Sequence, residues 1–465
     1  MDVSFRGFTA ISLDSNTHAR EPLLNRLSAC LPAAGSVTPG PAQGWVGLKP
    51  GEGQRVADFA HSPSLIRLLA DCRPGYSLPQ ALYLRDDAFA ADLRLLGGRW
   101  LLAGHVSQAT DAGDWFTAEF GAESAIVVRG EDGVLRALAN VCPHRGSRVC
   151  VDKAGSGAMF TCPYHAWSFR LDGALRAARE MPASFDPADH GLTALPLKVI
   201  GGLVFISFGA APPALGAAET AIAAMTGLYD WENARIAHRA TYRVAANWKL
   251  VMENYHECYH CGPSHPEFSV LHALSRPGNR SLSPDTDPET GLADVEAWGP
   301  AADGCETARV MRSPLSEGCL TGSRDGKPLA PPMGRGGASW NGQCVFGELG
   351  MTSAFLAYAD HGVLYRFIPR GALDTEMEVI WLVRGDAVEG RDYDLARLIW
   401  LWDVTSAEDK LIIERNQAGV RSRAYRPGPF SLMEPGTQAY VARYVAELSG
   451  AIGGPLSEDR GTHGL

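Results

Sequence analysis

Short apolar runs separated by two-residue turn signals fill the segment from residue 94 to 208. Asp132-Gly133, Asp172-Gly173 and Gly201-Gly202 each follow one run rich in apolar and β-branched residues and precede another. Turn dipeptides between apolar runs are the strongest local signal for a β-hairpin. The sequence therefore predicts a small antiparallel β-domain over residues 94–208.

The rest of the chain mixes helical patterns with strands, so the predicted fold class is α+β. A helix is expected over 247–260, two strands over 362–370 and 376–385, and paired helices over 391–403 and 407–418. Residues 275–340 are rich in Gly, Pro, Ser and Asp, which is typical of long loops that wall an active site.

The two ends of the chain lack the texture of a packed domain. Residues 1–76 contain many prolines and glycines and are predicted to form a partly irregular N-terminal extension. Residues 77–93 are expected to form a lead-in helix that packs on a second domain over 209–449. Residues 450–465 are expected to be a disordered tail.

Charge and hydropathy exclude two large classes of partner. The 465 residues carry 42 Lys and Arg against 52 Asp and Glu, a formal net charge of −10, with no dense basic block to neutralise phosphates. Apolar stretches are interrupted by Gly, Pro or charge well before the roughly 18 residues of a membrane span. The N-terminus lacks the pattern of an export signal. We expect a cytoplasmic protein that binds neither nucleic acid nor membrane.

Two Cys/His pairs lie in turns of the predicted β-domain. Cys142-Pro-His144 is followed, after seventeen residues, by Cys162-Pro-Tyr-His165. Two thiolates and two imidazoles fit either zinc or a 2Fe-2S centre. A zinc finger groups its cysteines together and its histidines together on a helix, whereas each hairpin loop here supplies one of each. That order lets one iron take both thiolates and the other both imidazoles, which favours a 2Fe-2S cluster.

A second group of metal-ligating residues follows in the predicted helix 247–260. Glu253, Glu257 and His260 have the spacing i, i+4, i+7 and would share one helical face. His265 would lie about 140° away on an unbroken helix, so both imidazoles reach one metal only if the helix stops between them. Gly262-Pro263 is expected to supply that stop. Two histidines and one carboxylate form the facial triad of non-haem Fe(II) oxygenases, and the carboxylate must come from elsewhere.

Together these motifs resemble those of the Rieske non-haem iron oxygenases, the α-subunits of ring-hydroxylating and N-demethylating systems, from about residue 77 to 445. The resemblance implies a Rieske-type antiparallel β-domain over 94–208 and a catalytic domain of helices over an antiparallel sheet, a helix-grip arrangement, over 209–449. It implies one Rieske 2Fe-2S cluster and one mononuclear non-haem Fe(II) per chain. It also implies a homotrimer in which cluster and iron of neighbouring subunits work together.

The resemblance places the missing carboxylate far downstream, at the start of a C-terminal helix, and the matching residue is Asp409. Glu408 and Asp403 are the alternative ligands. These acids can also be explained without a metal, as helix-capping residues, because Thr405-x-x-Glu408 and Ser406-x-x-Asp409 match helix capping boxes.

Glu257 occupies the position of the family's bridging acid, which links a cluster-ligating histidine of a neighbouring subunit to an iron-ligating histidine. The usual residue is Asp. Glu at this position, and Ala166 where the family often has Gly, resemble the branch of carnitine, glycine-betaine and stachydrine oxygenases. Cys258-x-x-Cys261 also matches a redox C-x-x-C motif, but no βαβ unit surrounds it, so the two thiols are expected to pack in the helix.

The protein is therefore predicted to be an oxygenase component that uses O2 to hydroxylate a small organic molecule. The favoured reaction is oxidative N-demethylation of a quaternary ammonium compound such as a betaine. Electrons must come from a separate NAD(P)H-dependent reductase or a ferredoxin, because the chain lacks a G-x-G-x-x-G fingerprint. Dihydroxylation of an aromatic ring is the alternative within the class, and an iron-sulfur electron carrier is the alternative outside it. Candidate residues for an aromatic cage around the ammonium are Trp340, Phe346, Phe355 and Tyr358.

Overall fold

The computed structural model describes residues 63–272, 292, 295–296 and 305–453, which belong to one compact unit, Val56–Leu465. Residues 1–62 of the predicted extension and 454–465 of the predicted tail lie outside the described residues. Residues 450–453 form the last turn of helix α10, so the prediction that they are disordered is wrong. Within the described ranges, the structure holds no helix with the length and apolar character that a membrane crossing requires.

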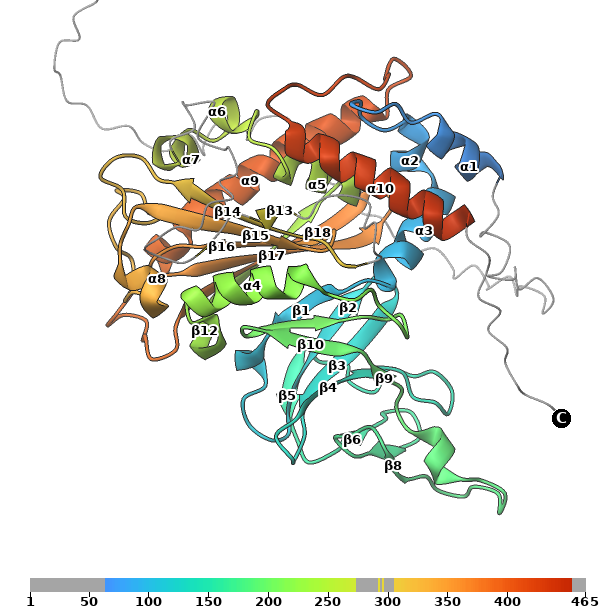
Figure 1. The fold of residues 1–465 in the computed structure, drawn as a ribbon. Coiled ribbons are helices and arrows are strands. Elements are labelled where there is room, and N and C mark those ends of the chain that lie inside the picture. The colour runs from blue at the N-terminus through green and yellow to red at the C-terminus, as the bar shows by residue number, and fades with distance from the viewer. Residues whose placement is uncertain (1–62, 273–291, 293–294, 297–304, 454–465) are drawn as a thin grey trace, which may run out of the picture. The chain divides into compact units, whose positions relative to one another are not determined.

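The first half of the described chain is the predicted antiparallel β-domain, with small sheets in the orders β5-β2-β3-β4-β9, β1-β11-β10 and β6-β7-β8 (Figure 1). All three predicted hairpins are confirmed: Asp132-Gly133 joins β3 to β4, Asp172-Gly173 joins β7 to β8, and Gly201-Gly202 joins β10 to β11. The strands are β1 Leu101–His105, β2 Asp114–Phe120, β3 Glu123–Arg129, β4 Leu135–Ala139, β5 Ala154–Ser156, β6 Phe160–Thr161, β7 Ser168–Phe169, β8 Leu175–Ala177, β9 Ala194–Leu195, β10 Leu197–Ile200 and β11 Leu203–Ile206.

The second half is built on one antiparallel sheet in the order β12-β18-β17-β16-β15-β14-β13. Helices α5, α9 and α10 cover one face of this sheet and α4 covers the other (Figure 1). The strands are β12 Ala234–Val244, β13 Val295–Glu296, β14 Ala308–Pro314, β15 Gln343–Leu349, β16 Ser353–Ala357, β17 Gly362–Gly371 and β18 Asp374–Arg384. The helices are α1 Pro63–Ala70, α2 Gln80–Leu84, α3 Asp86–Gly97, α4 Ala217–Leu228, α5 Trp248–Tyr255, α6 Cys261–Ser264, α7 Pro266–Leu271, α8 Gly334–Ala338, α9 Leu395–Val420 and α10 Pro435–Gly453. The predicted α+β class, with helices over an antiparallel sheet, is confirmed.

Three predicted elements differ from the structure. The single lead-in helix over 77–93 is two helices, α2 and α3, because Arg85 between them has an extended backbone. The region 275–340 contains strand β14 and helix α8. The paired helices over 391–403 and 407–418 are one continuous helix, α9.

The hydroxyl groups that suggested a helix start within α9 are used in other ways. The Thr405 hydroxyl donates to the carbonyl of Leu401, one turn earlier in the same helix, at 2.8 Å. The Ser406 hydroxyl lies 2.9 Å from the Tyr365 hydroxyl on strand β17. Because neither side chain caps a helix, the capping-box interpretation of this segment is wrong.

Candidate functional site: two metal centres

Two turns of similar construction hold the predicted cluster ligands. In the first, the N–H of Cys142 donates to the carbonyl of Ser147, and the N–H of Gly146 donates back to the carbonyl of Cys142. The second repeats both bonds with Cys162, Trp167 and Ala166 in the corresponding places. Both turns therefore present a cysteine and a histidine from a backbone that is fixed locally.

Each turn requires a residue with a left-handed backbone conformation after its histidine. Gly146 has φ +76° and Ala166 has φ +59°. Glycine adopts this conformation freely, whereas a residue with a Cβ is strained there. The sequence identified Gly146 as a turn residue, and the structure shows that Ala166 bears the same conformation at a cost.

The four predicted ligands converge at the tips of these turns. The thiols of Cys142 and Cys162 influence each other's pKa, and the rings of His144 and His165 have centroids 4.6 Å apart. Nδ1 of His144 is buried without a hydrogen-bond partner. A buried ring nitrogen without a partner, beside two thiols and a second imidazole, fits a bound 2Fe-2S cluster.

The surroundings of the two histidines differ. The ring of His144 stacks on the buried Trp167, with centroids 4.7 Å apart, whereas His165 is exposed and stacks on the half-exposed Tyr164. Burial raises the pKa of the Cys142 thiol. In Cys162 the N–H groups of Tyr164 and His165 outweigh burial and lower the thiol pKa. The cluster ligands therefore reach the protein surface through His165.

The second centre depends on an early helix end that the sequence did not predict. The predicted helix over 247–260 is confirmed at its start, but α5 ends at Tyr255, so the prediction is wrong for its last five residues, and Glu257 and His260 are not on its face. The Glu257 carboxylate accepts hydrogen bonds from the N–H groups of Tyr259 and His260, the latter at 3.1 Å, which stabilises a turn in place of further helix.

The predicted stop at Gly262-Pro263 is also wrong, because both residues lie inside the short helix α6. His260 precedes this helix and His265 follows it. The change of direction that brings both imidazoles to one point therefore comes from the non-helical segment after Tyr255 and from the limited length of α6.

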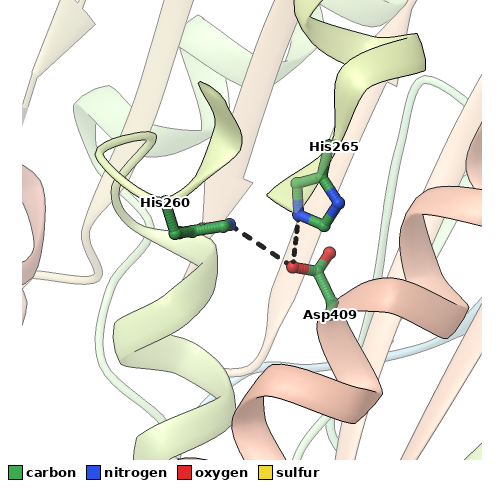
Figure 2. A group of neighbouring side chains, drawn as sticks. All are labelled: His260, His265 and Asp409. Atoms are coloured by element: carbon green, nitrogen blue, oxygen red, sulfur yellow. Dashed lines mark hydrogen bonds and ion pairs between the residues drawn. The ribbon is translucent and has the colours of Figure 1, made fainter. Parts of the chain in front are cut away.

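His260, His265 and Asp409 point toward one another in Figure 2. The Oδ1 atom of Asp409 lies 3.4 Å from Nε2 of His260 and 3.0 Å from Nε2 of His265. One ligand atom from each residue lies within 4.8 Å of the others, a spacing that fits a metal ion. Asp409 comes from the middle of α9, not from a helix start as predicted.

A second carboxylate lies behind each imidazole. Oε1 of Glu257 is 2.5 Å from Nδ1 of His260, and Oε2 of Glu408 is 2.8 Å from Nδ1 of His265. Carboxylates in this position fix the ring tautomer, so that Nε2 is left free to face a metal. Asp403, the other alternative ligand, accepts a hydrogen bond from the Tyr242 hydroxyl instead.

The electrostatics of this group match a cation site. Burial opposes charge on His260, but hydrogen bonds to Asp409 and Glu257 dominate and raise its pKa to about 9. The pKa of His265 is raised for the same reason by Asp409 and Glu408. Burial likewise raises the pKa of Asp409, but the two histidines overcome this and lower it. The carboxylates thus favour positive charge on the imidazoles, and a divalent cation would supply positive charge at the same place.

A cavity opens beside the three residues. Its floor consists of two cross-strand pairs of β14 and β15, Arg309 with Glu348 and Met311 with Phe346. Its walls include aromatic side chains of α5, α7 and α9, namely Tyr255, Phe268 and Trp402. A cavity of this kind, apolar with a few polar groups, is typical of small-molecule sites.

The sequence predicted little of this lining. Phe346 lines the cavity, whereas Phe355 packs in the core under α4 and the Tyr358 hydroxyl contacts His272. Trp340 does not line the cavity. The missed residue Trp402 precedes Asp409 by seven positions, which is two helical turns, and that spacing was the available signal.

The prediction for Cys258 and Cys261 is wrong, because the two residues form a disulfide. Cys258 precedes His260 in sequence and Cys261 follows it; both line the cavity, and Sγ of Cys261 is 3.9 Å from Nε2 of His260. Their spacing matches a C-x-x-C motif, which was the available signal.

Two family descriptions match the chain. Residues 99–196 match the Rieske [2Fe-2S] domain, and residues 231–450 match the catalytic domain of the ring hydroxylating alpha subunit. The glycine betaine monooxygenase oxygenase subunit of Pseudomonas aeruginosa is 37% identical over 379 residues, which cover 77% of this chain and 85% of the relative. The carnitine monooxygenase oxygenase subunit of Escherichia coli is 38% identical over 210 residues, 43% of this chain and 55% of the relative.

The fold is also shared with solved structures. A quaternary ammonium Rieske monooxygenase superposes with a TM-score of 0.63 at 23% identity, covering 83% of this chain and 98% of the other. A naphthalene 1,2-dioxygenase from Rhodococcus superposes with a TM-score of 0.58 at 17% identity, covering 84% and 99%. The domain content implies one Rieske 2Fe-2S cluster and one mononuclear iron per chain. This protein belongs to the Rieske non-haem iron oxygenases, as an oxygenase α-subunit of the ring-hydroxylating family.

Proposed function

We propose that this oxygenase removes an N-methyl group oxidatively from a small quaternary ammonium compound such as a betaine. The observation that carries the proposal is the group His260, His265 and Asp409 beside a cavity with aromatic walls. Aromatic faces attract a cation that cannot donate hydrogen bonds. The names of the glycine betaine and carnitine relatives point to the same substrate class.

We assign the metal ligands as follows. Cys142 and Cys162 would hold one iron of the cluster, and His144 and His165 the other. His260, His265 and Asp409 would hold the mononuclear iron through Nε2, Nε2 and a carboxylate oxygen. Support comes from the convergence of these atoms and from the carboxylates behind both imidazoles.

In the proposed reaction, the metals, when bound, would relay two electrons from the external donor and activate O2, so that one oxygen atom enters a methyl group and the other leaves as water. The protein residues bind and orient the substrate. Tyr255, Phe268 and Trp402 would surround the ammonium and keep water away from the methyl group that faces Asp409. The hydroxylated product is an N-hydroxymethyl ammonium, which loses its hydroxyl proton as the C–N bond breaks and gives formaldehyde and the demethylated amine.

Glu257 is proposed to connect the two kinds of centre between subunits of a homotrimer. Its carboxylate already holds Nδ1 of His260, and both residues line a second opening as well as the substrate cavity. His165 is exposed at the tip of the Rieske domain, so a neighbouring copy has a surface through which to approach. We further propose a cytoplasmic location, and a separate NAD(P)H-dependent reductase or ferredoxin as electron donor.

The test is a panel assay with a reductase of this class, NADH and O2. We expect formaldehyde in equal amount to the substrate consumed for one or more of glycine betaine, carnitine and stachydrine. A cis-diol from naphthalene or benzoate, without formaldehyde from any betaine, would instead identify an aromatic dioxygenase. Electron uptake without consumption of O2 would identify an electron carrier.

A further inference from the structure

One charged pair lies in the floor of the substrate cavity. Arg309 on β14 and Glu348 on β15 are direct cross-strand partners, and the pair Met311 and Phe346 lies two residues further along on the same face. All four side chains line the cavity. Arg309 retains 17% of its side-chain exposure and Glu348 retains 8%.

The guanidinium of Arg309 is mostly buried, yet it makes few hydrogen bonds. Its Nε is buried without a hydrogen-bond partner, and Nη2 donates only to the sulfur of Met311, at 3.6 Å. Nη1 lies 3.9 Å from Oε1 of Glu348, an ion pair beyond hydrogen-bond reach. Across the described residues this guanidinium donates no hydrogen bond to an oxygen atom. The N–H groups of a guanidinium lie in one plane and can donate two parallel hydrogen bonds to a carboxylate. The free N–H groups of Arg309 could therefore bind a carboxylate.

Glu348 does not fill that role, because no hydrogen bond joins it to Arg309 and its Oε2 faces His256 instead. Its Oε2 lies 3.5 Å from Nε2 of His256, closer than its contact with Arg309. The ring of His256 is itself fixed, by a 2.6 Å contact from Nδ1 to the carbonyl of Met252 and by stacking on Tyr440. Burial raises the pKa of Glu348, but the charges of His256 and Arg309 reverse the shift and lower it. The surroundings therefore favour the charged form of Glu348, whose charge faces the guanidinium of Arg309.

We infer that Arg309 binds the carboxylate of a zwitterionic substrate, with Glu348 as its positioning residue. This inference rests on the proposed function and narrows it. Aromatic walls alone accept any quaternary ammonium, whereas a guanidinium in the floor selects those that also carry a carboxylate. A site built to hydrogen-bond one group discriminates strongly against an analogue that lacks it.

The first test needs no variant. Anaerobic titration calorimetry on the wild-type holoenzyme compares glycine betaine with its amide, which has the same shape and ammonium but no carboxylate charge. We expect the amide to bind about 10- to 100-fold more weakly, the range for loss of a charge-assisted pair. Equal binding of both compounds would overturn the role of Arg309 while leaving the proposed function intact. If neither glycine betaine nor its amide binds, the comparison is repeated with carnitine and stachydrine and their amides; binding of none of them would contradict the proposed function, and the inference with it.

Substitution assigns the selectivity to one residue. In Arg309→Gln, binding of glycine betaine should weaken to the level of the amide, and binding of the amide should change less than threefold. Arg243→Gln removes the same charge from strand β12, at the opposite edge of the sheet, and should keep the wild-type preference. Arg309→Lys retains a cation in the floor and should retain part of the preference, which keeps the test open if the Gln variant does not fold. Equal loss of affinity for both compounds in both Arg309 variants would overturn the inference.

Discussion

Glu257→Gln tests how the iron site is held. The Glu257 carboxylate, 11% exposed, lies 2.5 Å from Nδ1 of His260 and also accepts that residue's backbone N–H at 3.1 Å. Glutamine keeps the shape but loses the charge. Hydrogen bonds to charged groups contribute roughly 1.5–3 kcal/mol, and loss of a partner behind a metal ligand weakens metal binding by about 10- to 100-fold.

The assay is anaerobic titration of iron-depleted protein with Fe(II) against a competing chelator. We expect the Kd of Glu257→Gln for Fe(II) to rise about 10- to 100-fold, with unchanged visible absorption from the cluster. Oxidation of the reduced cluster in the presence of substrate and O2 should also slow, because Glu257 is the proposed link between centres. Glu219→Gln, at a half-exposed ion pair on α4, serves as the control. An Fe(II) affinity within threefold of wild type would refute the reasoning.

Four further predictions follow from single residues. Asp409→Ala should lose the mononuclear iron and turnover but keep the cluster absorption, as checked by metal analysis and a visible spectrum; wild-type activity would move the ligand to another acid. Cys142→Ser should abolish the cluster absorption, and an intact spectrum would contradict the ligand assignment. Ala166→Gly should stabilise the protein by about 1 kcal/mol, since glycine relieves the left-handed backbone strain, and a lowered melting temperature would count against this. Burial raises the pKa of Glu253 from 4.5 to about 8, so the folded state keeps a proton that the unfolded state releases. Stability should fall by up to about 1.4 kcal/mol per pH unit between those values, and Glu253→Gln should flatten that slope in thermal melts.

Local chemistry explains what the sequence could predict. The Asp-Gly and Gly-Gly turns of the β-domain were predictable because a hairpin turn depends on its own two residues. The group Cys142, His144, Cys162 and His165 was predictable because each pair lies within one short turn. His260 and His265 were found for the same reason, since only five positions separate them.

Tertiary contacts explain what the sequence could not predict. Helix α9 continues through Ser406 because the hydroxyl contacts Tyr365 on a distant strand. Helix α5 ends early because the Glu257 carboxylate accepts backbone N–H groups beyond it. The pairing of Arg309 with Glu348 depends on the register of β14 and β15, which no local pattern specifies.

The central claim is that one chain carries two different iron centres. Metal analysis of anaerobically purified protein, read beside its visible spectrum, tests this most directly. We expect about three iron atoms per chain, two in a cluster with Rieske absorption and one mononuclear. Zinc in place of iron, or a cluster spectrum with only about two iron atoms per chain, would contradict it.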